Sequence, residues 1–199
     1  AQDEFPRIVL APGDPEECFW MTTEAFNLAE IYQTPVIILT DKHLAESHKT
    51  TDIFDDGLVK IDRGLLMSAQ AQKKRFLRYK VTDSGISPRP IFGRKGFTFL
   101  ANSDEHSEFG FSEESIENRK AQMEKRMKKL ETLSENIPNP KVYGSKNTKL
   151  TFVGWGSSKG AILEAQKILK REGTKTNFLH LNYLNPFPAN FVSKFLKPA

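Results

Sequence analysis

The chain has 199 residues, which fits one or two domains. Apolar residues make up 38% of it and charged residues 27%, enough for a hydrophobic core, so wholesale disorder is excluded. Its one cysteine, Cys18, excludes an internal disulfide, a cysteine metal site and an iron–sulfur cluster held by this chain alone. The cysteine content fits a reducing cytoplasm.

The net charge is +4, and much of it lies in two basic runs, 73–75 and 125–129. Nucleic-acid binding needs such runs interleaved with aromatic or base-reading side chains, which these lack. Residues 125–129 alternate with apolar helix positions, so we expect a solvated helix face, with an acidic partner protein as the alternative. No apolar run approaches the ~20 residues of a membrane span, and we expect no signal peptide. We expect a cytoplasmic protein without membrane or nucleic-acid partners.

The N-terminal part predicts a βαβ unit. Residues 8–11 form a short apolar strand, 15–33 a helix, and 36–41 a continuous apolar strand that we expect to be buried on both faces. The crossover implies a parallel sheet, whose ligands lie beyond the carboxyl ends of its strands. The segments 12–14 and 40–43 occupy such ends.

Several residues mark the start of the first helix. Asp14 occupies the N-cap, Pro15 the first helical position, and Glu17 the third position after the cap. Asp14, Glu16 and Glu17 could also act as paired carboxylates, but capping explains two of them without any chemistry, and we favour capping.

The middle of the chain is less regular, and 84–90 is too rich in turn residues to be helical. A long helix over 114–135 follows, with an apolar stripe that includes Ile116 and Met127, and a linker over 136–144. We predict strands over 58–61, 75–81 and 97–100, and a polar, exposed segment over 103–110.

The last segment restarts the α/β alternation, and Gly173 is its predicted helix stop. The inward side chains of its first helix are predicted to include Ile162 and Ile168. The predicted elements are a strand over 149–153, a turn over 154–158, a helix over 159–171, a strand over 176–181, a turn over 184–188 and a helix from 191.

The turn with Gly154, Gly156 and Ser157 could hold a phosphate, because glycines let the backbone approach and a helix N-terminus favours an anion. It lacks the third glycine of a dinucleotide motif and the ending of a P-loop. A tight strand-to-helix turn needs glycine for geometric reasons alone, which we favour.

Two further residues could take part in chemistry or binding. His106 lies among carboxylates and is acid–base material, although a solvated histidine explains it as well, and its spacing to other histidines matches no metal site. Arg89 lies between two prolines, where a rigid loop could present its guanidinium to a carboxylate, a phosphate or another subunit.

Taken in order, several segments resemble the alpha subunit of 2-oxoacid:ferredoxin oxidoreductases, and the 2-oxoglutarate type most. The resemblance spans essentially the whole chain. The matching segments are 6–17 (PRIVLAPGDPEE), 24–30 (EAFNLAE), 34–41 (TPVIILTD), 83–89 (DSGISPR), 105–110 (EHSEFG), 125–130 (KRMKKL), 153–157 (VGWGS) and 186–188 (PFP).

The resemblance implies an α/β fold in which residues 1–140 are the second half of a pyrimidine-type thiamine-diphosphate-binding domain with its extension. Residues 145–199 would open a transketolase C-terminal-like domain. The implied reaction is oxidative decarboxylation of a 2-oxoacid to an acyl-coenzyme A, with electrons passed through an iron–sulfur cluster to ferredoxin. A partner beta subunit would hold the diphosphate, its magnesium and a cluster.

In this family the substrate loop, the glutamate that activates the cofactor and a substrate-binding arginine lie upstream of the region matched here. The chain also starts without Met and stops within a helical pattern, so we expect it to be part of a longer polypeptide and inactive alone. No catalytic residue and no metal ligand are assigned. Arg89, His106, Gly156 and Ser157 are the candidate contacts to coenzyme A or a subunit. The competing hypotheses are a non-catalytic partner-binding module, with contacts on helix 114–135, and a nucleotide-binding domain that uses the Gly154 turn.

Overall fold

The computed structural model describes residues 5–68, 76–146 and 148–197. The basic run 73–75 therefore lies outside the described residues. The elements are β1 (Ile8–Leu10), α1 (Pro15–Tyr32), β2 (Val36–Ile38), α2 (Lys42–Ala45), the 3-10 turn η1 (Asp56–Leu58), α3 (Ile116–Ser134), β3 (Lys141–Gly144), β4 (Leu150–Trp155), α4 (Ser158–Arg171), β5 (Thr176–Leu181), β6 (Tyr183–Asn185) and α5 (Ala189–Leu196).

The described residues form two compact units. Unit 1 comprises residues 5–6, 27–34, 61–68 and 76–135, and unit 2 comprises 7–26, 35–60, 136–146 and 148–197. Unit 2 crosses the boundary predicted near residue 140, because it contains the first βαβ strands as well as the C-terminal segment. The division into a pyrimidine-type and a transketolase C-terminal-like domain therefore stays a prediction.

The first sheet of unit 2 has the order β2-β1-β6. β1 pairs with β2 in parallel, as the βαβ pattern predicts, and with β6 in antiparallel orientation. The prediction that 36–41 is buried on both faces is wrong, since the Ile37 side chain is 44% exposed. The physical reason is topological: β2 is an edge strand with β1 as its single neighbour, whereas Ile8 and Leu10 of the central strand are fully buried.

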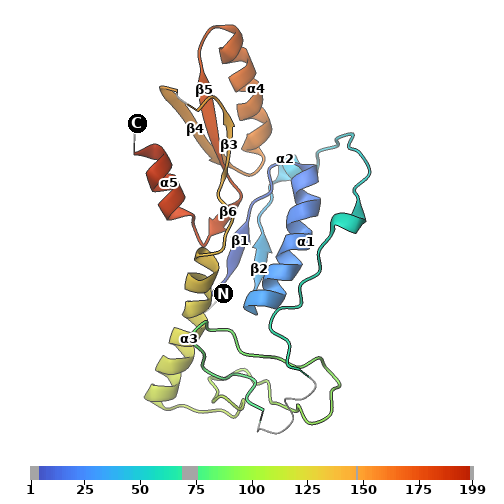
Figure 1. The fold of residues 1–199 in the computed structure, drawn as a ribbon, viewed down its shortest axis with the longest axis vertical. Helices are drawn as coiled ribbons and strands as arrows, with labels where there is room; N and C mark the ends of the chain where they lie inside the picture. The colour runs from blue at the N-terminus through green and yellow to red at the C-terminus, as the bar shows by residue number, and fades with distance from the viewer. Residues whose placement is uncertain (1–4, 69–75, 147, 198–199) are drawn as a thin grey trace. The chain divides into compact units, whose positions relative to one another are not determined.

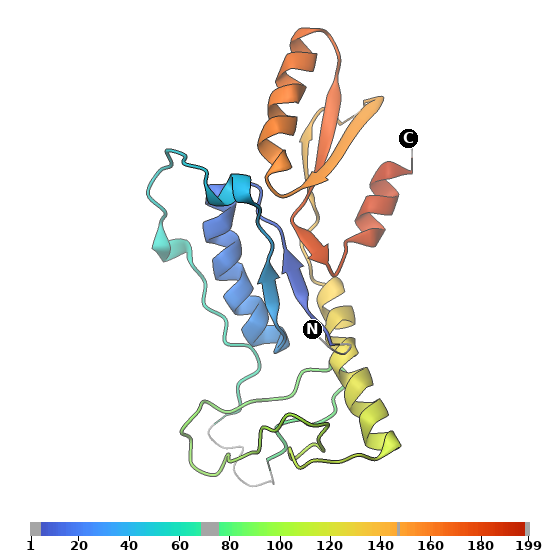
Figure 2. The same ribbon diagram turned by 180° about the vertical axis from the view of Figure 1, so that it is seen from behind.

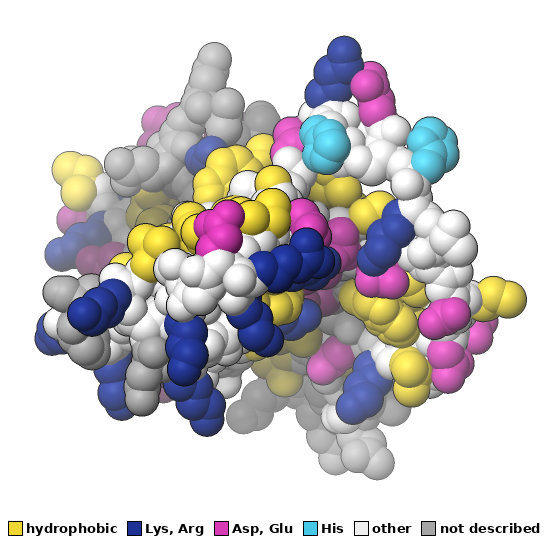
Figure 3. Space-filling view, turned by 90° about the horizontal axis from the view of Figure 1, so that it is seen from above, with side chains coloured by type: hydrophobic (Ala, Val, Ile, Leu, Met, Phe, Trp, Pro, Cys, Tyr) yellow, Lys and Arg dark blue, Asp and Glu magenta, His cyan; other side chains and the backbone are white. Residues whose placement is uncertain are grey.

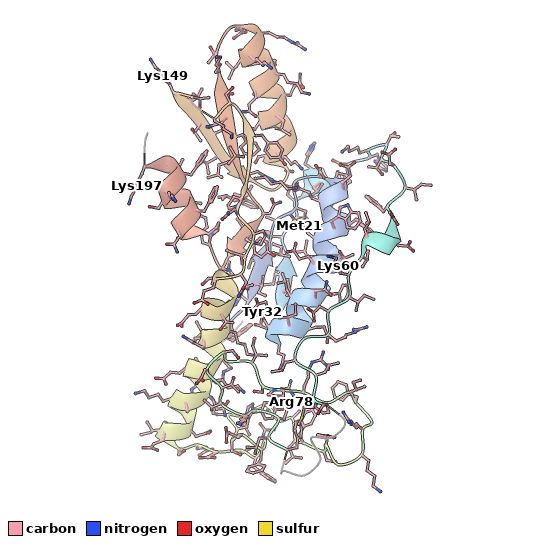
Figure 4. The ribbon with its side chains drawn as sticks, viewed as in Figure 1. Met21, Tyr32, Lys60, Arg78, Lys149 and Lys197 are labelled. Carbon is pink, nitrogen blue, oxygen red and sulfur yellow. The ribbon has the colours of Figure 1, made fainter. Side chains whose placement is uncertain are left out.

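Helix α1 begins as the capping pattern predicts. The Asp14 carboxylate accepts a hydrogen bond from the Glu17 amide at 2.9 Å, and the Glu17 carboxylate reaches back to the Gly13 amide at 2.8 Å. These bonds satisfy backbone donors that the first turn of a helix leaves free. The buried face of α1 includes Met21 and Tyr32, both labelled in Figure 4.

The second sheet of unit 2 has the order β3-β5-β4, and α4 lies along one of its faces in both Figure 1 and Figure 2. β4 and β5 are parallel, while β3 is antiparallel to β5 and forms inside the segment predicted as a linker. All residues of the central strand β5 are buried. Gly173 ends α4 with a φ of +82°, as predicted, but Ile168 is exposed rather than inward.

The middle of the chain forms fewer strands than predicted. Residues 58–61, the described part of 75–81, and 97–100 form no strand. Local bonds replace a ladder: the Val59 amide donates to the Asp56 carbonyl at 3.0 Å, and the Tyr79 hydroxyl donates to the Leu100 carbonyl at 3.0 Å. The segment 84–90 is non-helical, as predicted, and Gly85 there has a φ of +75°.

The long helix of unit 1 is confirmed as α3, with Ser115 as its N-cap. Its predicted apolar stripe is wrong in part, because Ile116 and Met127 are exposed. The segment 103–110 is less exposed than predicted, since Glu105 binds Arg119 at 3.0 Å and Arg126 at 2.5 Å. Burial alone would raise the pKa of the Glu105 carboxyl, but these ion pairs and the hydrogen bond from the His106 amide lower it to about 2.

Within the described residues, no helix is both long and apolar enough to cross a membrane.

Candidate functional site

The most concentrated polar cluster of unit 2 joins two strand-to-helix turns. β1 leads through Gly13 into α1, and β4 leads into α4, whose first turn carries Lys159. The Lys159 Nζ lies 2.5 Å from Asp14 Oδ2 and 2.6 Å from Glu17 Oε1. One lysine therefore connects to the capping carboxylates of a helix that begins more than a hundred residues earlier in the chain.

The remaining oxygens of this cluster also have partners. Glu17 Oε2 accepts from the Gly13 amide at 2.8 Å and from the Asn182 side chain at 3.0 Å. Asp14 Oδ1 accepts from the Glu17 amide. We call the set Asp14, Glu17, Lys159 and Asn182 the ion-pair cluster. Its carboxylates are fully engaged, which is the arrangement that lets charges be stable in a buried place.

The carboxylates and the ammonium group of the cluster stabilise one another in their charged forms. Burial by itself raises the pKa of Glu17, but the hydrogen bond and the charge of Lys159 outweigh burial and lower it, and the same holds for Asp14. Burial would lower the pKa of Lys159, yet its bonds to the two carboxylates raise it to about 12. All three groups are therefore ionised at neutral pH.

A buried histidine lies beside the cluster. His180 on β5 is 0% exposed, and its Nδ1 is 4.0 Å from Glu17 Oε2. Neither ring nitrogen has a hydrogen-bond partner among the described residues. Burial lowers the pKa of His180 despite the nearby Glu17 carboxylate, so the ring is neutral at pH 7.

Gly13 is required by packing at this point. A Cβ at residue 13 would lie 2.7 Å from Lys159 Cδ and 2.8 Å from His180 Cε1. The backbone of the first turn thus approaches the two side chains more closely than any other residue type permits.

Two cavities border the ion-pair cluster, and Glu17, Trp20 and Lys141 line both. One has a volume of about 270 Å³ and adds apolar walls from Met21 and Tyr183. The other has a volume of about 420 Å³ and includes Asp14 and Lys159. These volumes are large enough for a small ligand or a partner side chain.

Little in the sequence pointed to this cluster. Capping explained Asp14 and Glu17, and it is confirmed, but it concealed their second role as partners of Lys159. No sequence motif marks Lys159 or His180. The carboxylate partners of Lys159 are 142 and 145 residues away in the chain. The parallel pairing of β4 with β5 places Lys159 near His180, and the pairing of β6, the strand after β5, with β1 connects this sheet to the start of α1.

The four predicted contact residues fall in different units. In unit 1, Arg89 forms an ion pair with Glu30 and donates to the Arg63 carbonyl at 2.8 Å. His106 lies against Tyr79, with ring centroids 3.9 Å apart. Both side chains have local partners, and their roles as contacts stay predictions.

In unit 2, Gly156 has a φ of +60° with open space around its α-carbon, and the Ser157 hydroxyl donates to Asp41. The positive φ supports the geometric explanation of this turn, because L side chains rarely adopt it. A ligand contact at Gly156 and Ser157 is likewise still a prediction.

A family model described as "Pyruvate flavodoxin/ferredoxin oxidoreductase, thiamine diP-bdg" matches residues 1–125, which is more than half of the chain. The chain belongs to this family. The match covers the first βαβ unit and most of the irregular segment, and it agrees with the α/β fold and the parallel strand pair described above.

Relatives in sequence extend the match to the C-terminal segment. The 2-oxoacid:ferredoxin oxidoreductase subunit alpha of Saccharolobus solfataricus is 40% identical over 97% of this chain and 31% of its own length. The 2-oxoglutarate oxidoreductase subunit KorA of Mycobacterium tuberculosis is 31% identical over 94% of this chain and 28% of its own length.

A solved structure matches as well. It is 2-oxoglutarate:ferredoxin oxidoreductase from Magnetococcus marinus, described with 2-oxoglutarate, coenzyme A and succinyl-CoA bound. The TM-score is 0.86 at 31% identity, over 96% of this chain and 33% of that one. The chain thus spans about a third of the length of the relatives it matches.

The family implies thiamine diphosphate, so we tested the cluster as a place for it. The Asp14 and Glu17 oxygens bind Lys159 and local donors, which leaves none to coordinate the magnesium ion of a diphosphate. No group of three or more His, Cys, Asp or Glu that could hold a metal ion occurs in the part of the chain described here. The described residues do not fit the metal-diphosphate part of that cofactor.

Proposed function

We propose that this chain is part of the alpha subunit of a 2-oxoacid:ferredoxin oxidoreductase. The whole enzyme decarboxylates a 2-oxoacid oxidatively, transfers the acyl group to coenzyme A and passes electrons to ferredoxin. The observation that carries the proposal is the agreement of sequence and fold along 96% of the chain with the Magnetococcus marinus enzyme, at 31% identity and a TM-score of 0.86. At this identity the likeness extends beyond the fold alone.

We infer 2-oxoglutarate as the substrate. The support is that the Mycobacterium tuberculosis relative is named a 2-oxoglutarate oxidoreductase and the Magnetococcus marinus enzyme a 2-oxoglutarate:ferredoxin oxidoreductase. The relatives of higher identity have the broader name 2-oxoacid:ferredoxin oxidoreductase. Pyruvate is therefore the competing substrate that a test must include.

The proposed assembly includes a beta subunit, which holds the diphosphate of thiamine diphosphate, its magnesium and an iron–sulfur cluster, and ferredoxin as acceptor, in the cytoplasm. The engaged carboxylates of the ion-pair cluster are consistent with a magnesium site on another subunit. Arg89, His106, Gly156 and Ser157 are proposed as contacts to coenzyme A or to a neighbouring subunit. The 199-residue chain alone is expected to be inactive.

The test is to produce the full-length subunit that contains these residues together with its beta-type partner. Reduction of ferredoxin would be followed with 2-oxoglutarate or pyruvate, with and without coenzyme A. The expected result is reduction that requires coenzyme A and is faster with 2-oxoglutarate. Faster reduction with pyruvate would overturn the substrate, and failure with every 2-oxoacid would overturn the enzyme class. Measurable oxidation by the 199-residue chain without other subunits would contradict its inactivity.

A non-catalytic partner-binding module is the alternative, and exposed lysines give it some support. Several Lys and Arg side chains lie together at the lower left of the face shown in Figure 3, and others are scattered over the rest of it. In unit 2 the exposed basic residues include Lys149, Lys167, Lys170 and Lys175. Stable binding of an acidic protein by the full subunit, combined with no turnover, would favour this alternative. Binding of ATP to the chain alone would instead favour a nucleotide-binding domain.

A further inference from the structure

Helix α3 buries positive charge inside unit 1. Lys125 is only 7% exposed, and Lys129, one turn further on, is half-buried. The expectation that the run 125–129 is a solvated helix face is therefore wrong for these two lysines. A third cation, Arg78, is half-buried in the same unit and is labelled in Figure 4 among the loop segments. We call Lys125, Lys129 and Arg78 the cation cluster.

The cation cluster is hydrogen-bonded to neutral oxygens. Lys125 Nζ donates to the Tyr79 carbonyl at 2.8 Å, and Lys129 Nζ donates to the Gln33 carbonyl at 2.6 Å. Arg78 Nη1 donates to the Gln33 side-chain oxygen at 2.9 Å. In the residues that the structure describes, none of the three forms a salt bridge with a carboxylate. Their hydrogen-bond donors thus have acceptors, but their positive charges have no carboxylate counter-charge among the described residues.

A buried charge without a counter-charge is costly, and the pKa values of the two lysines show this cost. Burial lowers the pKa of Lys125 to about 7, and repulsion by Lys129, Arg78 and Arg126 adds to the shift. Burial and repulsion by Arg78 and Arg126 lower the pKa of Lys129 to about 8. Glu108 acts in the opposite direction on Lys125, but its carboxylate accepts from the Val81 amide at 2.7 Å.

A cavity of about 260 Å³ adjoins this cluster within unit 1. Arg78 and Gln33 line it. The cavity therefore reaches one cation directly, and it reaches Gln33, which accepts hydrogen bonds from both Arg78 and Lys129. Arg89 also lines it but is paired with Glu30, which leaves Arg78 as the guanidinium without a carboxylate partner among the lining residues. Phe92 and Phe99 supply apolar walls, and Phe92 is 83% exposed.

We propose that this cavity binds a small organic anion, a phosphate monoester or carboxylate attached to a flat apolar group. Arg78 donates to the anion, because a guanidinium matches the geometry of phosphate and carboxylate oxygens. Lys125 and Lys129 strengthen binding through their field, and the anion supplies the negative charge that the cluster lacks. The flat group packs on Phe92 and Phe99. The proposal does not depend on the substrate of the enzyme.

The test is calorimetric titration of the 199-residue chain with phenyl phosphate, benzoate, inorganic phosphate and, as a neutral analogue, phenol. Chloride would keep the ionic strength constant, so that general screening does not differ between titrations. The expected result is saturable binding of one phenyl phosphate or benzoate, weaker binding of inorganic phosphate and none of phenol. Absence of saturable binding of all three anions would overturn the proposal. Tighter binding of phenyl phosphate than of benzoate would identify a phosphate site, and the reverse order a carboxylate site.

Variants then assign the site. Arg78→Gln is expected to weaken phenyl phosphate binding by about tenfold, the loss of one charged hydrogen bond. Lys129→Gln, which removes a cation that does not line the cavity, is expected to weaken it by a smaller factor while circular dichroism stays native. Phe92→Ala should weaken phenyl phosphate more than inorganic phosphate.

The matched control is Lys120→Gln, which removes one charge from an exposed position of the same helix, where the lysine side chain is 76% exposed. It should leave affinity unchanged. If Arg78→Gln and Lys129→Gln fold and bind like the control, the anion is elsewhere and the proposal fails.

Discussion

Two buried lysines, one in each unit, have nearly the same exposure and opposite electrostatics. Lys159 in unit 2 is 8% exposed and Lys125 in unit 1 is 7% exposed. Burial lowers the pKa of both, but the pKa of Lys159 rises to about 12 and that of Lys125 falls to about 7. The difference lies in the acceptors, which are two carboxylates for Lys159 and a backbone carbonyl for Lys125.

The comparison separates what a hydrogen bond does from what a counter-charge does. A carbonyl satisfies a donor geometrically but provides little negative charge, so the cost of taking an ammonium out of water persists. In the ion-pair cluster two carboxylates offset this cost, so the cluster stabilises the fold of unit 2. In the cation cluster no carboxylate of the described residues offsets it, which makes unit 1 the place where an anionic ligand has most to contribute.

The largest effect is expected from Lys159→Met, which leaves Asp14 and Glu17 without their cation. We expect the free energy of unfolding at pH 7 to fall by about 3 kcal/mol, since a buried carboxylate without a partner is costly. The loss should shrink as the pH falls through the lowered pKa values of Asp14 and Glu17, because protonated carboxyls do not need the cation. Urea unfolding measures both effects.

The control for that variant is Lys167→Met, which breaks the exposed pair of Lys167 with Glu164 and should leave the free energy of unfolding nearly unchanged. Equal stability of the two variants would show that the buried ion pairs of Lys159 stabilise the fold no more than the exposed pair of Lys167.

A smaller effect is expected from Gly13→Ala. The added methyl would meet Lys159 Cδ at 2.7 Å and the fully buried His180 ring at 2.8 Å, so one of them must shift, at a cost of about 2 kcal/mol. Gly160→Ala is the matched substitution in α4, where nothing lies within 4 Å. It should raise the free energy of unfolding by up to about 1 kcal/mol through helix propensity. Thermal or urea unfolding measures the stability of both variants. An unchanged free energy of unfolding for Gly13→Ala would contradict the close packing at this residue.

The last effect is a pH dependence that tests the unpaired lysine. The folded pKa of Lys125 is about 7, below its ordinary value of 10.5, so between these values the unfolded chain binds more protons than the folded one. Stability relative to Lys125→Met should therefore rise with pH, by about 2 kcal/mol between about pH 7 and pH 9. Urea unfolding of the unsubstituted chain and of Lys125→Met at both pH values measures this difference, and Lys120→Met is the control. A gap to Lys125→Met that stays constant would show that Lys125 has a counter-charge after all.

Local signals in the sequence were sufficient for several regular elements of unit 2, but not for β3 and β6, which overlap the segments predicted as a linker and a turn. The cap at Asp14, the apolar strand before it and the glycine stop at Gly173 each depend on neighbouring residues, and each is confirmed. They failed in the middle of the chain, where the strands predicted over 58–61, 75–81 and 97–100 are absent from the described residues. Short apolar runs there pack as aromatic contacts, such as Phe76 on Phe97 at 5.4 Å, which alternation along a chain does not distinguish from a strand.

The sequence by itself determined the α/β alternation, the helix caps and the family resemblance, because each is encoded over a few neighbouring residues. Only the tertiary structure decided which lysines are paired. Lys159 meets carboxylates that lie 142 and 145 residues away, whereas Lys125, in a run that looked like a solvated face, meets a carbonyl 46 residues away. Charge compensation is a property of distance in space, and no local pattern records it.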